Sequence, residues 1–276
     1  MKKLTTDERV RVISALVEGN SIRATSRMTG IAKNTIVKLL REIGCACTEF
    51  QNKVLRNLKT RRVQCDEIWS FCYSKAKNVP KEKREMFGFG EVWTWIAIDA
   101  DTKLVPCWLV GLRDGGYATD FIRDLASRLS NRVQLTTDGH KPYLEAVEDG
   151  LGREIDYSQL VKVYGRDKSS ETRYSPPQCV GCTKTDRVGK PDPKHVSTSF
   201  VERQNLTMRM GMRRFTRLIN ELSKKVENLA HAVGLHFMHY NFVRVNLSLR
   251  VTPAMKAGVS DHVWEIEEMV GLLDEF

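Results

Sequence analysis

The chain has 276 residues, with 44 Lys and Arg against 34 Asp and Glu, a formal net charge of +10 and a pI near 9.3. This balance favours a polyanionic partner such as nucleic acid, and a hydrophobic content of 41% excludes a disordered tail. No apolar run approaches the roughly 18 residues of a membrane span. No secretory signal follows the Met-Lys-Lys start. The seven cysteines are irregularly spaced, which argues for reduced thiols. We therefore expect a cytoplasmic, nucleoid-associated protein with no membrane partner.

Most of the excess positive charge lies at the amino terminus, where residues 1–62 hold 14 Lys and Arg against 5 Asp and Glu. The apolar spacing predicts a helix from Thr6, as its cap, to Val17, then a short helix capped by Ser21 and, after a glycine turn, a third helix over 33–43. This arrangement is typical of a helix-turn-helix, with a solvated basic tail as the alternative.

The third helix is the expected recognition helix, because Asn and Lys side chains can reach base edges in the major groove. The side chains expected there are Lys33, Asn34, Thr35, Lys38 and Arg41. The predicted organisation is a helix-turn-helix domain over 1–45, a basic linker over 46–62, and a larger domain over 63–276 with an insertion at about 152–198.

The larger region changes to strand-like periodicity. Its predicted elements are strands over 63–71, 91–99 and 104–110, a helix over 117–129, a strand over 133–137, and a helix over 143–147. The order βββαβα, with Asp66 in the first strand and Asp138 after the fourth, matches the ribonuclease-H-like (RNase H-like) fold, an α/β mixed sheet flanked by helices. The first and fourth strands are neighbours in that fold, so the two aspartates are expected to converge.

A third carboxylate is expected from a later helix that opens near residue 197 and carries Glu202 in its first turn. Arg209, two helical turns on, shares a face with that glutamate. Glu67 alternates to the opposite face of its strand and is interpreted as structural or solvent-facing. Asp99 and Asp101 are interpreted as turn or salt-bridge residues, with Asp99 as a reserve catalytic candidate.

Asp66, Asp138 and Glu202, with a basic residue seven positions after the glutamate, resemble the DDE motif of transposases and retroviral-type integrases. The segments Cys-Asp-Glu-Ile-Trp-Ser-Phe, Thr-Thr-Asp-Gly-His-Lys-Pro-Tyr and Ser-Phe-Val-Glu-Arg-Gln-Asn-Leu-Thr-Met-Arg resemble bacterial insertion-sequence transposases of the IS-one type, and the similarity spans roughly residues 63–270.

This resemblance implies a transposase that binds terminal inverted repeats in double-stranded DNA. Asp66, Asp138 and Glu202 would be both catalytic residues and ligands of two Mg²⁺ or Mn²⁺ ions per active site. Water would free a 3′-OH at the element's end, and that hydroxyl would attack target DNA. The resemblance also implies a homodimer or larger assembly on DNA. The basic side chains expected near phosphate on the later helix and beyond it are Arg203, Arg209 and Arg213.

Two other functions stay open: a DNA-binding regulator with an inactive RNase H-like domain, and a metal-dependent nuclease without strand transfer. Cys179 and Cys182 have the spacing of half a zinc site, although the stretch 165–198 is more typical of a loop insertion near the DNA. A helix expected over 218–243 carries three histidines that are interpreted as packing or surface residues.

Overall fold

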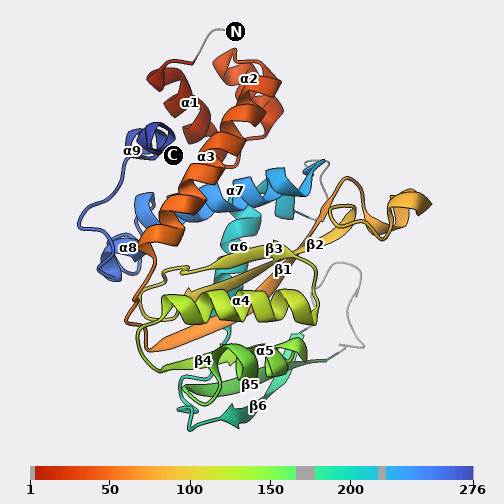
Figure 1. Ribbon diagram of the computed structural model, residues 1–276, viewed down its shortest axis with the longest axis vertical. Helices are drawn as coiled ribbons and strands as arrows, with labels where there is room; N and C mark the ends of the chain where they lie inside the picture. The colour runs from red at the N-terminus through yellow and green to blue at the C-terminus, as the bar shows by residue number, and fades with distance from the viewer. Residues whose placement is uncertain (1–3, 166–177, 217–221, 276) are drawn as a thin grey trace.

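A computed structural model describes residues 4–165, 178–216 and 222–275. Three N-terminal helices stand at one end of the molecule, and a mixed sheet flanked by helices forms the other (Figure 1). The α-helices are α1 Thr6–Val17, α2 Ile22–Thr29, α3 Lys33–Val54, α4 Gly115–Arg128, α5 Pro142–Leu151, α6 Ser199–Gly211, α7 Val226–Met238, α8 Pro253–Lys256 and α9 Ile266–Gly271. In the part of the chain described, no helix combines the length and the apolar character needed to cross a membrane.

One six-stranded sheet organises the larger region. Its strands are β1 Arg62–Cys72, β2 Gly90–Asp99, β3 Trp108–Gly111, β4 Val133–Thr137, β5 Ile155–Gly165 and β6 Gln178–Val188. The short remaining helices are η1 Ala76–Asn78, η2 Lys81–Lys83, η3 Arg213–Phe215 and η5 Leu272–Asp274, with a π-helix, η4, at His239–Val243.

The strand order is β3-β2-β1-β4-β5-β6. The first three strands form an antiparallel meander, β4 runs parallel to β1, and β5 runs parallel to β4. The predicted meander and the predicted pairing of the first and fourth strands are therefore confirmed. The arrangement is consistent with an RNase H-like sheet to which β6 adds an antiparallel edge.

The sheet separates two hydrophobic cores, and β1 contributes to both because successive side chains of a strand point to opposite faces. Cys65 packs in the core that α4 and α5 cover, together with Phe121 and Tyr143. Ile68 packs in the other core, which α3, α6, α7 and α9 complete. Because β1 contributes to both cores, its side chains point to either face of the sheet.

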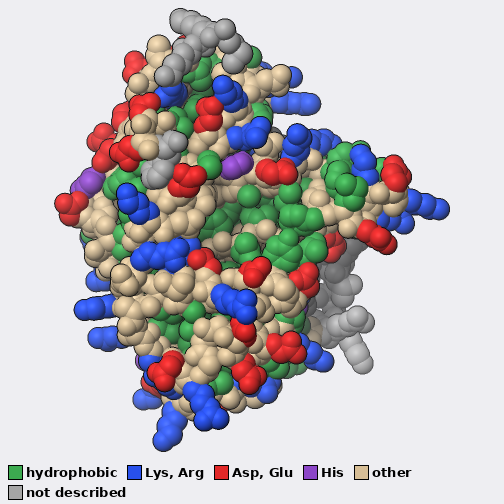
Figure 2. Space-filling view, in the orientation of Figure 1, with side chains coloured by type: hydrophobic (Ala, Val, Ile, Leu, Met, Phe, Trp, Pro, Cys, Tyr) green, Lys and Arg blue, Asp and Glu red, His purple; other side chains and the backbone are tan. Residues whose placement is uncertain are grey.

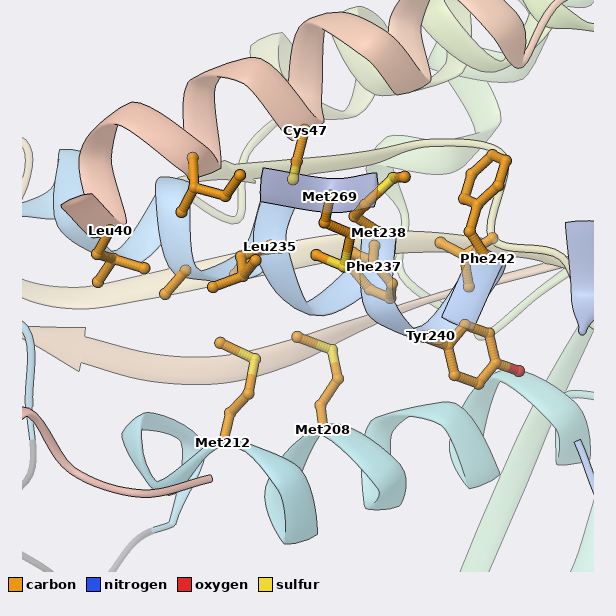
Figure 3. Close-up of a cluster of buried hydrophobic side chains, with 14 of the residues drawn as sticks. Leu40, Cys47, Met208, Met212, Leu235, Phe237, Met238, Tyr240, Phe242 and Met269 are labelled. Atoms are coloured by element: carbon orange, nitrogen blue, oxygen red, sulfur yellow. The ribbon is translucent and has the colours of Figure 1, made fainter. Parts of the chain in front are cut away.

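The second core joins elements that are far apart in the sequence (Figure 3). Met208 of α6 and Met212, the residue after that helix, point toward α7, and Cys47 of α3 points toward the same helix from the opposite side. Full burial of such side chains removes apolar surface from water and contributes about 1.5–3 kcal/mol each. The N-terminal helices therefore share their core with the C-terminal ones.

The helices α1 and α2 lie where the sequence predicts them, but α1 is capped by Thr5 and not by Thr6. The Thr5 hydroxyl accepts a hydrogen bond from the Glu8 amide at 3.2 Å, and the Glu8 carboxylate accepts one from the Thr5 amide at 2.8 Å. This reciprocal capping box needs a glutamate three residues after the cap, which only Thr5 has. Ser21 caps α2 through the Ala24 amide, as predicted.

The prediction that the third helix ends near residue 43 is wrong, because α3 continues to Val54 along α7. A Cβ atom at Gly44 would lie 2.5 Å from the His231 carbonyl oxygen, so glycine permits the close approach. Further along, the Gln51 side chain donates to the Gly234 carbonyl at 3.2 Å. The predicted domain boundary at residue 45 thus falls inside a continuous helix, and the predicted linker over 46–62 contains the second half of that helix.

Three further elements differ from expectation. The third strand was expected over 104–110 but begins only at Trp108. Before it, the Val105 amide donates to Asn241 Oδ1 and the Val105 carbonyl accepts from Asn241 Nδ2, both at 3.0 Å, so these groups do not pair with a strand. Within the predicted loop over 165–198, residues 178–188 form strand β6, which pairs antiparallel with β5 at the edge of the sheet. The helix expected from residue 218 begins at Val226, because the Ser223 carbonyl instead accepts a hydrogen bond from Tyr73 beyond the end of β1. Leu218 itself lies outside the described residues.

Candidate functional site

A cavity of about 750 Å³ opens where β4 ends and its two neighbours continue. The last residue of β4, Thr137, pairs with Cys65 and Gln159, whereas β1 and β5 run on past this point. All three carboxylates predicted from the sequence line this cavity. The charged side chains that line it are Asp66, Asp138, Glu202, Arg113, Lys141 and Lys162.

Asp66 enters the cavity from the middle of β1, on the face that α6 covers. Its Oδ2 accepts a hydrogen bond from Asn205 Nδ2 of α6 at 2.8 Å, and its Oδ1 accepts one from the Glu67 amide at 2.9 Å. Burial, and then the charges of Glu67 and Asp138, raise the pKa of Asp66 to about 7. The carboxylate is held in one orientation but is costly to ionise without a further cation.

Asp138 is the first residue after β4, so no strand pairing holds its backbone. Its Oδ1 accepts a hydrogen bond from the His140 amide at 2.9 Å, which fixes the turn that follows the strand. Its Oδ2 lies 3.4 Å from Arg113 Nη2, and its carbonyl accepts from Gln159 Nε2 at 3.2 Å. The convergence of Asp66 and Asp138 expected from the strand order is therefore present.

Glu67 contributes a carboxylate that the sequence analysis assigned to a structural or solvent-facing role. It does alternate away from Asp66, but its side chain is fully buried, so the solvent-facing interpretation is wrong. Its Oε2 accepts from Arg113 Nε at 2.9 Å, and the buried Tyr143 side chain also interacts with the Glu67 carboxylate. One carboxylate oxygen from each of Asp66, Glu67 and Asp138 lies within 4.8 Å of the others.

The environment of Glu67 explains why its carboxylate joins this acidic group. Burial and the charge of Asp138 raise the pKa of Glu67 to about 7, in spite of the nearby Arg113 guanidinium. That guanidinium also lies 4.8 Å from the centre of the Trp93 ring, which holds it in place. The sequence did contain one signal of this role, because Asp66 and Glu67 are consecutive acidic residues in a strand that otherwise contributes to the core.

Glu202 reaches the cavity from the first turn of α6, as predicted. Both of its oxygens bond to Lys162 Nζ of β5, Oε1 at 2.6 Å, and Oε1 also accepts from the Thr198 hydroxyl at 2.7 Å. Its carboxylate is not part of the group within 4.8 Å. The sequence analysis missed Lys162, because a lysine in a strand gives no signal of a distant partner.

The position of α6 depends on another residue that was missed, Gln64 of β1. Its Oε1 accepts from the Phe200 amide at 2.8 Å and the Val201 amide at 3.2 Å, so a side chain of the sheet caps the helix. Gln64 lies two residues before Asp66 on the same face of β1. The strand that carries Asp66 therefore also fixes the helix that carries Glu202.

The reserve candidate Asp99 lies at the other end of the sheet, opposite Val63. It is buried and accepts hydrogen bonds from the Thr60 hydroxyl and the Asp101 amide, while Asp101 pairs with Arg62. Both aspartates are turn and salt-bridge residues, as the sequence predicts.

The side chains predicted to contact DNA lie mostly at the surface. The exposed ones are Lys33, Asn34, Lys38, Arg41, Arg203, Arg209 and Arg213, and Thr35 is half-buried. Lys38 pairs with Glu42 at 3.6 Å across one helical turn. Lys and Arg side chains project around α2 and the start of α3, near the top of Figure 2. Their contact with DNA stays a prediction.

Cys179 and Cys182 are exposed on β6, where the strand register places them opposite Tyr164 and Lys162. Among the described residues, the acidic group around Asp66 contains no cysteine, and no cluster of three potential metal ligands includes either thiol. The zinc site therefore stays a prediction that rests on spacing alone.

No protein-family model matches the chain, and no curated protein matches its sequence. Among solved structures, the cryo-EM structure of the piggyBac transposase synaptic complex with hairpin DNA is similar at a TM-score of 0.38 and 10% identity. The alignment covers 99% of this chain and 71% of that chain. A likeness this distant does not assign the chain to a family.

Proposed function

We propose that the protein is a DNA transposase that uses a divalent metal ion to hydrolyse a phosphodiester at an element's end and to join the freed 3′ end to target DNA. The observation that carries the proposal is the grouping of Asp66, Glu67 and Asp138 within 4.8 Å, with Glu202 in the same cavity. The strand order that brings Asp66 beside Asp138 is consistent with the RNase H-like fold expected from the sequence.

The residues present fit a hard divalent cation. All the candidate ligands are carboxylate oxygens, which favour Mg²⁺ or Mn²⁺ over zinc. Burial and neighbouring acids raise the pKa values of Asp66 and Glu67 to about 7, in spite of the Tyr143 and Arg113 side chains beside Glu67, so a cation would stabilise charges that the protein compensates only in part. We propose Asp66, Asp138 and Glu202 as the residues that hold the metal, with Glu67 beside them.

When bound, two such ions would activate the attacking oxygen and stabilise the leaving 3′ oxygen. The protein's own groups prepare the site for that chemistry. Asn205 and the Glu67 amide orient Asp66, Arg113 and the His140 amide orient Asp138, and the capping of α6 by a β1 side chain positions Glu202. These contacts place the carboxylates of Asp66 and Asp138 before any ligand arrives, which lowers the cost of binding one.

DNA is the proposed substrate because the chain carries a net charge of +10. A polyanion can approach the acidic cavity only where Lys and Arg side chains offset the repulsion. Recognition of terminal repeats by α2 and α3, kinship with IS-one type transposases, and assembly on paired ends are further parts of the proposal. They are supported by the sequence motifs and by the exposed cations of α3 and α6.

The test is a joining assay with purified protein, Mg²⁺ or Mn²⁺, a labelled duplex made from the DNA that flanks the coding sequence, and supercoiled plasmid. We expect labelled DNA to become covalently joined to plasmid, and we expect Asp138→Asn to abolish joining while DNA binding persists. Asp101→Asn is the matched control, because it removes a carboxylate outside the cavity. Cleavage without joining would support a nuclease, and binding with neither reaction would support a regulator.

A further inference from the structure

Lys162 occupies the candidate site in a way that the proposed chemistry leaves unexplained. Its ammonium bonds both oxygens of Glu202, and both side chains line the cavity together with Asp66 and Asp138. The Lys162 and Glu202 side chains are 28% and 40% exposed, so a ligand that enters the cavity can reach either one. A cation thus already holds one of the predicted metal ligands.

The position of Lys162 follows from the length of β5. This strand pairs with β4 only as far as Gln159, and its last residues, which still pair with β6, extend beyond the end of β4 and form one wall of the cavity. Lys162 and Tyr164 both line the cavity, and the register of β5 against β6 shifts between Val163 and Tyr164. The wall is close to the turn after Asp138, because a Cβ atom at Gly139 would lie 2.7 Å from Val161 Cγ2.

The ion pair and a metal ion would compete for the same carboxylate. The oxygens of Glu202 already accept hydrogen bonds from Lys162, and Oε1 accepts a further one from Thr198. An ammonium group that stayed there would be close to a divalent cation held by Asp66 and Asp138, and like charges at such a separation repel strongly in a partly buried site. Lys162 now bonds both oxygens of Glu202, so Glu202 can bind a metal ion only if at least one of these contacts is given up.

Lys162 is well suited to exchange partners. Its charge is compact and sits on a flexible four-carbon stem, so it can move from one anion to another within the same cavity. Once Glu202 turns to a metal ion, the phosphate of a DNA strand that enters the cavity is the next anion available to it. We propose that Lys162 is a phosphate-binding residue that Glu202 holds in the free protein and releases when it takes up the metal.

This inference rests on the proposed function, because it needs a metal ion and DNA in one site. It also predicts reciprocal coupling: the factor by which metal tightens DNA binding equals the factor by which DNA tightens metal binding. Acylating reagents react with the neutral amine of lysine, and an ion pair lowers this reactivity because it shields the nitrogen and keeps it protonated. Its reactivity therefore reports which partner it has.

The first experiment measures acylation of Lys162 by mass spectrometry in the full-length protein, with Ca²⁺ as the metal probe and a short duplex of random sequence as the DNA probe. We expect Lys162 to be protected in the free protein, reactive with Ca²⁺ alone, and protected again with Ca²⁺ and DNA together. Lys184 of β6, which bonds the Pro193 carbonyl outside the cavity, is the internal control and should not respond to Ca²⁺ alone.

The second experiment measures Ca²⁺ affinity by calorimetry in the absence of DNA. We expect Lys162→Met to tighten Ca²⁺ binding about five-fold more than Lys141→Met does, because an exposed ion pair contributes up to about that factor. Lys141 is the matched control, since it lines the same cavity and forms no ion pair with a described carboxylate. Lys162→Arg should keep the wild-type affinity within about two-fold, because the competing charge remains.

Protection of Lys162 that Ca²⁺ does not change, or equal Ca²⁺ affinities for the two methionine variants, would overturn the inference. If wild-type protein still joins DNA in Mg²⁺ under those results, the proposed function stands and only the role of Lys162 fails. If wild-type protein binds neither Ca²⁺ nor DNA, the proposed function fails together with the inference.

Discussion

Carboxylates gather at both ends of the sheet, and the two groups differ in what surrounds them. At the amino end of β1, Asp101 pairs with Arg62, and the arginine hydrogen bond lowers the pKa of that carboxyl. At the cavity end, burial and neighbouring acids raise the pKa values of Asp66 and Glu67 to about 7. The ionised carboxylate is thus favoured at the amino end of β1 and disfavoured at the cavity end.

The difference lies in the number of cations that each group has. Asp101 has its own arginine, whereas at the cavity end Arg113 serves both Glu67 and Asp138, and Asp66 has only neutral donors. The cavity end therefore carries negative charge that no described side chain balances. Such a deficit is costly for folding and useful for binding a metal ion, which is why strongly raised carboxyl pKa values mark functional sites.

The largest expected effect is on activity. Asp66→Asn should lower DNA joining by about 1000-fold, because a metal-bound oxygen contributes to transition-state stabilisation directly. Asp101→Asn should leave the rate within about two-fold, since its ion pair serves only the local structure. Initial rates of joined product in Mg²⁺ measure both. Equal losses in the two variants would show that the two ends do not differ in function.

The next effect is on stability. Arg113→Met should lower the free energy of unfolding at pH 8 by about 3 kcal/mol, because it leaves the buried Glu67 carboxylate unpaired. At pH 5 the loss should be smaller, since the pKa of Glu67 near 7 keeps that carboxyl largely protonated in the folded protein. Denaturant unfolding at the two pH values measures this difference. The matched control is Arg132→Met, whose exposed pair with Asp156 should contribute under about 1 kcal/mol at both.

A smaller effect of opposite sign is expected for Glu67→Gln. The folded-state pKa of Glu67 lies above its ordinary value of 4.5, so its contribution to stability is full below that value and is lost as the pH rises through about 7. Removing the charge should therefore stabilise the protein by about 1 kcal/mol at pH 8 and change little at pH 4. Thermal unfolding across this range measures the gain. A loss of stability that is equal at both pH values would contradict the account of Glu67.

The part of this arrangement that could be predicted is the part that depends on local pattern and strand order. Asp66 lies in a strand of alternating residues, Asp138 follows a short apolar strand, and Glu202 opens an amphipathic helix, so each element was predictable from its own residues. The first-to-fourth strand pairing then brings the two aspartates together. That pairing is a long-range contact, and it was predictable only because the order of the elements resembles the RNase H-like fold.

The rest depends on contacts between distant residues. Glu67 alternates away from Asp66, and only the approach of Arg113 from another loop shows that it is buried beside the site. The extension of α3 depends on Gly44 meeting His231, nearly two hundred residues later in the chain. Lys162 meets Glu202 because β5 is longer than its neighbour β4, and strand lengths are among the least predictable features of a sequence.

The smallest expected effect is on the stability contributed by the ion pair at the amino end of β1. Asp101→Asn should lower the free energy of unfolding at pH 7 by about 0.5 kcal/mol, the contribution of a partly exposed ion pair with Arg62. Because the folded-state pKa of Asp101 is lowered from 3.8, that contribution is present above the ordinary value and is lost as the pH falls. The difference between variant and wild type should therefore shrink in acid, as should the Glu67→Gln difference, because both carboxyls are then protonated. Unfolding curves of both variants at pH 3 and pH 8 would show whether the two stability differences have opposite signs at pH 8.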